Sequence, residues 1–165
     1  MKKLFALVAV GLLGACVSQK PPVKLLATPD DPKILNRVNQ KGTSRIQGQA
    51  FMRQVGGGVV TAAGEKVGLF VATPYTEEAF ATVKSGQNID QSTDTLNFKQ
   101  YIKTTTADAT GNFEFDQIPP GNYVVVTKVA WQVPQGRYGM SDEGGVLNQK
   151  VTVAQGQTAK IIMNR

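Results

Sequence analysis

The sequence predicts a mainly β protein: one β-sandwich of about seven strands, with a short helical insertion, preceded by a signal peptide and a tether. Residues 104–128 carry most of this prediction. Within them, Phe113 and Phe115 alternate with polar residues, which is the period of a half-buried strand. Residues 123–129 are β-branched at almost every position, so we expect this strand to be covered on both faces. Turns rich in Asp, Pro and Gly separate these strands.

Residues 1–15 are typical of a secretory signal peptide. Lys2 and Lys3 form a basic start, and the apolar run that follows is shorter than the roughly 20 residues of a membrane-spanning helix. The tetrapeptide LGAC at residues 13–16 resembles a bacterial lipobox, in which the cysteine carries a lipid. The alternative is an ordinary signal peptide followed by an incidental cysteine. We favour lipidation because the spacing, the small flanking residues and the presence of a single cysteine in the chain, Cys16, all agree with it.

Resemblance to bacterial lipoproteins implies a membrane anchor at Cys16, and Val17 in place of Asp implies sorting to the outer membrane. A lipidated Cys16 leaves no thiol for a disulfide, so the hydrophobic core must hold the domain together. Removal of the signal lowers the net charge from +6 to +4, because two lysines are lost. This mild excess, spread along the chain, argues against nucleic acid as a partner.

Residues 16–44 are predicted to be the lipidated N-terminus and a semi-rigid tether, because prolines favour extended chain. Residues 30–39 could instead form one or two helical turns with Ile34, Leu35 and Val38 as an apolar edge. We favour an irregular linker. The prolines of the tether are Pro21, Pro22, Pro29 and Pro32.

The folded domain is expected at residues 45–165. Glycines 56–58 are predicted to form a hairpin turn, which we favour over an anion-binding loop because no helix follows them. We expect strands at residues 45–52, 66–73, 98–106, 112–116, 123–129, 146–153 and 157–163.

An insertion at residues 73–97 begins with a predicted helix. Thr73 is a suitable cap, Pro74 suits the first helical position, and two acids lie in the first turn. Tyr75 and Phe80 either cover an open part of the sheet, which we favour, or contact a partner. The apolar face of the helix comprises Tyr75, Ala79, Phe80 and Val83.

Residues 131–145 are expected to form a second long loop. Trp131 could close the core at the end of a strand. Arg137 and Tyr138 are residue types that often anchor interfaces, so they are candidate partner-binding residues. The alternative is a solvated connection, the default for such a glycine-rich segment.

The stretch around residues 104–128 also resembles the carboxypeptidase regulatory-like domains, a family with a transthyretin-like sandwich. The resemblance implies a Greek-key β-sandwich over residues 45–165, and residues 46–50 and 67–69 resemble its first two strands. Many unrelated proteins use this sandwich, so the resemblance implies no particular activity. The matching residues are Thr105, Ala107, Asp108, Gly111, Phe113, Phe115, Ile118, Gly121, Tyr123 and Val125.

The composition argues against most catalytic chemistry. The chain has no histidine, which excludes Ser-His-Asp triads, Cys-His pairs and the usual zinc sites. Glu77 and Glu78 would point about 100° apart on a helix and could not face one substrate. The spacing of Asp108, Thr110 and Asn112 hints at a calcium loop, but the glycine is misplaced, so a structural turn is favoured. We expect no enzyme, no cofactor and no metal site.

Two functional classes remain. The first is a non-catalytic outer-membrane lipoprotein whose sandwich binds or supports another component of the cell envelope, a protein or a glycan. The second is a surface-displayed module that binds carbohydrate or peptide through the insertion and residues 131–145. Aromatic side chains gathered on an exposed face would favour the second class.

Overall fold

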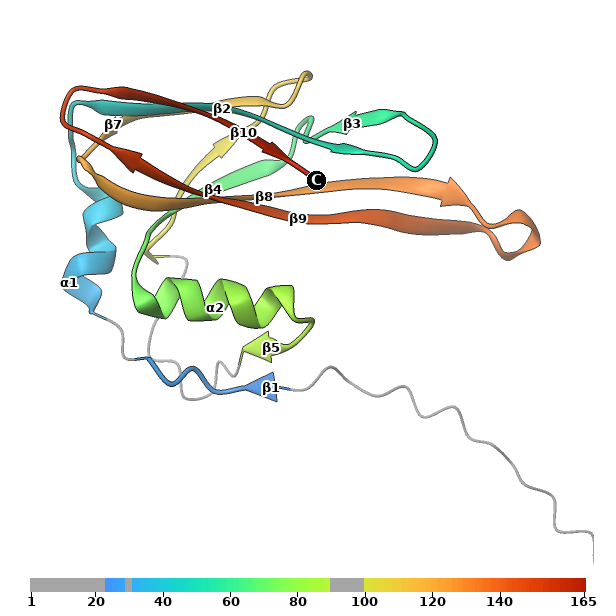
Figure 1. The fold of residues 1–165 in the computed structure, drawn as a ribbon, viewed down its shortest axis with the longest axis horizontal. Coiled ribbons are helices and arrows are strands. Elements are labelled where there is room, and N and C mark those ends of the chain that lie inside the picture. The colour runs from blue at the N-terminus through green and yellow to red at the C-terminus, as the bar shows by residue number, and fades with distance from the viewer. Residues whose placement is uncertain (1–22, 29–30, 90–99) are drawn as a thin grey trace, which may run out of the picture.

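The computed structural model describes residues 23–28, 31–89 and 100–165, apart from the Tyr138 side chain. These residues form two four-stranded β-sheets that pack face to face (Figure 1), which confirms the predicted β-sandwich. Their strands are β2 (Ser44–Arg53), β3 (Val59–Thr61), β4 (Lys66–Val71), β6 (Lys103–Thr106), β7 (Asn112–Ile118), β8 (Gly121–Pro134), β9 (Met140–Val153) and β10 (Thr158–Asn164). The remaining elements are β1 (Val23–Lys24), α1 (Pro32–Leu35), η1 (Asn36–Asn39), α2 (Pro74–Lys84), β5 (Asn88–Ile89) and η3 (Gly136–Tyr138).

Strand β2 organises the first sheet. It pairs in parallel with β10 on one side, and antiparallel with β7 and then β3 on the other. The second sheet has the order β6-β4-β8-β9, and every neighbouring pair is antiparallel. Alternate residues of both sheets point inward and form one core, since successive side chains of a strand face opposite sides.

Polar groups inside the sandwich are satisfied. Tyr123 is buried, and its hydroxyl donates to the carbonyl oxygen of Pro119 at 2.7 Å. Burial raises the pKa of this phenol. Among the described residues, no buried side-chain nitrogen or oxygen lacks a hydrogen-bond partner.

Two strand predictions need correction. The short strand β3 was missed, and it pairs with the end of β2 across the predicted glycine turn. Strand β6 begins at Lys103 rather than at residue 98, and residues 90–99 lie outside the described part of the chain.

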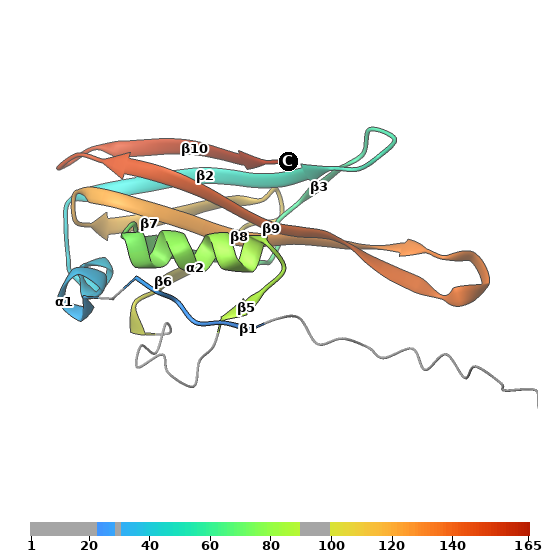
Figure 2. The same ribbon diagram turned by 60° about the horizontal axis from the view of Figure 1, so that its bottom comes forward.

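The predicted loop at residues 131–145 is a strand hairpin. Strands β8 and β9 stay paired from Gly121 opposite Val153 to Pro134 opposite Met140, and Figures 1 and 2 show this hairpin extending beyond the rest of the sandwich. The glycines misled the sequence analysis: Gly144 lies within β9, opposite Ala130. A Cβ atom there would collide with the carbonyl oxygen of Val129, so glycine permits the close approach of the strands.

Residues 32–39 are helical, so the favoured linker interpretation was wrong there and the helical alternative is right. The Asp31 side chain accepts a hydrogen bond from the Lys33 N–H and caps α1. Leu35 and Val38 are buried, whereas Ile34 is exposed. Helix η1 is also tied to the sandwich, because Arg37 donates to the carbonyl oxygen of Pro120 at 2.7 Å.

Helix α2 forms where the sequence predicts it, with Thr73 and Thr76 in a reciprocal capping box. It covers the outer face of the second sheet, and β1 and β5 lie on its far side (Figure 2). Phe80 meets Phe70 of β4 edge to face, with ring centroids 5.1 Å apart. Val83 is exposed, contrary to the prediction; the buried residues of α2 are Tyr75, Thr76, Ala79 and Thr82.

Candidate functional site

The structure does not gather the predicted partner-binding residues into one site. Tyr75 is buried against Leu35, so its side chain has a structural place in the fold. Phe80 is half-buried on α2, and Arg137 is exposed at the far tip of the β8–β9 hairpin. The side chain of Tyr138, and Cys16 with the whole signal sequence, lie outside the described part of the chain.

Exposed aromatic residues do not mark a binding face either. Among the residues that the structure describes, none of the exposed large hydrophobic side chains is aromatic. Trp131 packs partly buried against the core, as the sequence suggests. No helix of the described ranges is long and apolar enough to cross a membrane.

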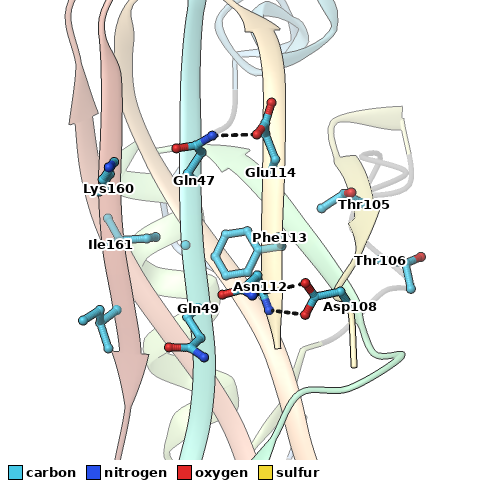
Figure 3. A pocket seen from close by; sticks show the side chains of 12 residues that line it. Gln47, Gln49, Thr105, Thr106, Asp108, Asn112, Phe113, Glu114, Lys160 and Ile161 are labelled. Carbon is cyan, nitrogen blue, oxygen red and sulfur yellow. Dashed lines mark hydrogen bonds between the residues drawn. The ribbon is translucent and has the colours of Figure 1, made fainter. Parts of the chain in front are cut away.

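A groove with mixed polar and apolar lining lies instead on the outer face of the first sheet, with a volume of about 820 Å³. The pairing register arranges its side chains in rows across three strands. Lys160 of β10, Gln47 of β2 and Glu114 of β7 form one row (Figure 3). Two positions along the strands, Ile162, Gln49 and Asn112 form the next row.

The floor between the two rows is main chain, because Ile161 and Phe113 point their side chains inward and Gly48 between them has no side chain. A Cβ atom at Gly48 would collide with the Phe113 ring. The absence of a side chain at Gly48 therefore lets Phe113 and Ile161 pack against its main chain on the core side. The groove is therefore open above and rigidly supported below. Thr105 and Thr106 of β6 extend its lining past the edge of β7.

The charges of the groove are partly paired. Glu114 accepts a hydrogen bond from the Gln47 amide at 2.7 Å. It also forms an ion pair with the Arg45 guanidinium at 3.2 Å. Lys160 makes no ion pair with any residue of the described ranges. The rows thus present one ammonium group, amides, and a carboxylate whose charge is already balanced.

Asp108 closes the groove at the turn between β6 and β7. One of its oxygens accepts from the Thr110 N–H and hydroxyl at 2.8 Å and from the Asn112 N–H at 2.9 Å. The Thr110 hydroxyl is the main cause that lowers the pKa of Asp108 to about 2, followed by the Asn112 N–H. These bonds confirm the predicted structural turn.

No group of three or more His, Cys, Asp or Glu residues in the described ranges is placed to hold a metal ion. Glu77 and Glu78 diverge as predicted: Glu77 pairs with Lys150, and Glu78 pairs with Lys24. The amides of the groove supply hydrogen-bond donors and acceptors, and the Lys160 ammonium group, which has no ion-pair partner in the described ranges, supplies further donors and a positive charge.

The sequence analysis missed this groove. Its residues appear in the sequence as ordinary solvent-facing positions of three separate strands. The one available signal was the run of outward polar residues at positions 47, 49, 112, 114 and 160.

No protein-family model and no curated protein matches the chain. Among solved structures, it is similar to the crystal structure of "a putative carbohydrate binding protein" from Pseudomonas aeruginosa. The two chains share 27% identity with a TM-score of 0.67, and the match covers 83% of this chain and 99% of the other. The match supports the β-sandwich. The resemblance to the carboxypeptidase regulatory-like family stays a prediction.

Proposed function

We propose that the protein is a non-catalytic carbohydrate-binding module, anchored by a lipid on Cys16, that holds a glycan in the groove across β10, β2 and β7. The observation that carries this proposal is the groove itself, with two rows of side chains, polar except for Ile162, above a main-chain floor. The similarity to the Pseudomonas aeruginosa protein supports the ligand class. The lipobox-like tetrapeptide and Val17 support a place at the outer membrane.

The groove offers what a sugar ring needs. The Gln47 amide already donates to Glu114, and the Gln49 amide donates to the Thr110 carbonyl oxygen at 3.0 Å, so each keeps one further N–H and its carbonyl oxygen for a ligand. Lys160 adds three donors, which suits hydroxyl groups. Ile162 is 63% exposed beside Gln49, so it can cover the apolar face of a ring.

The test measures retention of the purified mature protein, in detergent, on a panel of insoluble and immobilised polysaccharides. Gln47→Ala and Lys160→Ala should each weaken binding roughly ten-fold, the loss expected for about one hydrogen bond of 1.5 kcal/mol. Gln149→Ala is the matched control, because Gln149 is exposed on β9 of the other sheet. The proposal fails if no polysaccharide retains the protein, or if the groove variants bind as well as the control.

A further inference from the structure

A second hollow lies on the opposite side of the sandwich, between α2 and the outer face of β8 and β9. It has two adjoining parts, of about 240 Å³ and about 310 Å³, and both are lined by Glu77 and Lys150. We call this hollow the α2 crevice. Besides these two residues, its smaller part is lined by Phe80, Ala81, Lys84, Val124 and Asn148, and its larger part by Ala72, Asn122, Tyr123, Val151 and Thr152.

An ion pair bridges the α2 crevice. The Lys150 Nζ and Glu77 Oε1 atoms are 2.7 Å apart, although both side chains are largely in solvent, with 67% and 45% of their surface exposed. Exposed ion pairs contribute little to stability, so this pair is free to open. The salt bridge joins the helix to the sheet across the place where the two parts meet.

The α2 crevice carries an excess of positive charge. Lys84 lines the smaller part and makes no ion pair with any residue of the described ranges. Two ammonium groups therefore face one carboxylate. Beneath them, the half-buried Phe80 gives the smaller part an apolar surface, with the buried Val124 behind it, and Asn148 adds an amide. A small ligand with one apolar face and one carboxylate would complement these ammonium groups and this apolar surface.

We propose that the α2 crevice binds a carboxylate-bearing sugar, such as a uronic acid residue, whose carboxylate replaces Glu77 on Lys150. Glu77 occupies the site in the free protein and competes with the ligand. The ring would lie on Phe80, and its hydroxyls would reach Asn148. This site goes beyond the glycan groove, since it uses the other sheet and a different ligand charge.

The surroundings favour a sugar over an acidic peptide. Side chains of α2, β8 and β9 line the crevice, and their strands are already paired there, Val124 with Lys150 and Asn122 with Thr152. An extended peptide would pair with the outer edge of β9, which has no partner strand in the described part of the chain, whereas the crevice presents side chains of α2 and of the sheet face. The small volume of the apolar part suits a single ring.

The experiment titrates oligogalacturonate into the mature protein in detergent, by calorimetry, with its methyl-esterified form as the uncharged probe. Lys150→Gln should weaken binding roughly ten- to hundred-fold, as expected when a charge-assisted hydrogen bond is lost. Glu77→Gln should tighten it roughly two- to five-fold, because it removes the competing carboxylate. Lys128→Gln is the control for net charge, because Lys128 is exposed on β8 and does not line the crevice.

Opposite effects of the two substitutions on affinity distinguish a binding site from a structural ion pair. If the ion pair were only structural, Lys150→Gln and Glu77→Gln would change the affinity in the same direction. The inference is overturned if Glu77→Gln weakens binding or leaves it unchanged, if Lys128→Gln acts like Lys150→Gln, or if the esterified probe binds equally well. Tighter binding of poly-glutamate than of oligogalacturonate would overturn the ligand class. Gln47→Ala should leave this affinity unchanged, so failure of the groove and failure of the crevice are distinguishable.

Discussion

The segment before β2 provides a direct test of where the folded domain begins. If residues 32–39 were a tether, replacing their apolar side chains would not change stability. In the structure, Leu35 packs with Tyr75 of α2, and Val38 is part of the main core. We therefore expect Leu35→Ala and Val38→Ala to destabilise the whole sandwich.

The magnitudes follow from burial. Leu35 is 2% exposed, so its truncation should lower the free energy of unfolding by about 2–5 kcal/mol. Val38 is completely buried, and the loss of its two methyl groups should cost about 2 kcal/mol. In a domain of this size, Leu35→Ala should lower the Tm by roughly 6–20 °C.

The assay is urea unfolding of the mature protein in detergent, followed by tryptophan fluorescence from Trp131. Ile34→Ala is the matched control, since Ile34 is in the same helix and 48% exposed, so its effect should stay within about 0.5 kcal/mol. If Leu35→Ala and Ile34→Ala unfold at the same urea concentration, the helix does not belong to the folded domain and the reasoning is refuted.

Two further predictions concern the anchor and the response to acid. Cys16→Ser should abolish incorporation of radioactive fatty acid, and equal label in this variant would contradict the lipid anchor. The pKa of Glu78 is lowered from 4.5 to about 2, chiefly by the Thr28 hydroxyl, and that of Asp108 from 3.8 to about 2, chiefly by the Thr110 hydroxyl. Both carboxylates stabilise the fold in full above about pH 4.5, and this contribution is lost as the pH falls toward 2, because the unfolded chain takes up protons first. The free energy of unfolding, measured with urea, should fall as the pH drops through this window, and it should fall less steeply in Glu78→Gln. The same pH dependence in Glu78→Gln and in the unmodified protein would contradict the role of Glu78.

Local signals predicted the elements that depend on local chemistry. The cap of α2 at Thr73, the turn at Asp108 and the alternation of Phe113 and Phe115 each depend on residues close in sequence. The structure reproduces all three, because the hydrogen bonds and the strand period that define them span only a few residues.

Elements that depend on distant partners were missed. Residues 32–39 are helical in a context where Leu35 packs against Tyr75, which is forty positions away. Residues 131–145 are rich in glycine, yet β8 and β9 continue through them since each strand supplies hydrogen bonds to the other. Tertiary contacts outweighed weak local propensity in both segments.

The groove across β10, β2 and β7 shows why a candidate binding face in a β-sandwich is hard to find in a sequence. Lys160, Gln47 and Glu114 are far apart along the chain, and only the register of β10, β2 and β7 makes them one row. A shift of β10 by one residue would turn Lys160 inward and bring Ile161 to the surface. The inward packing of Ile161 beside Gly48 and Phe113 therefore fixes the register of β10. Through this register, the core determines which polar side chains face outward in the groove.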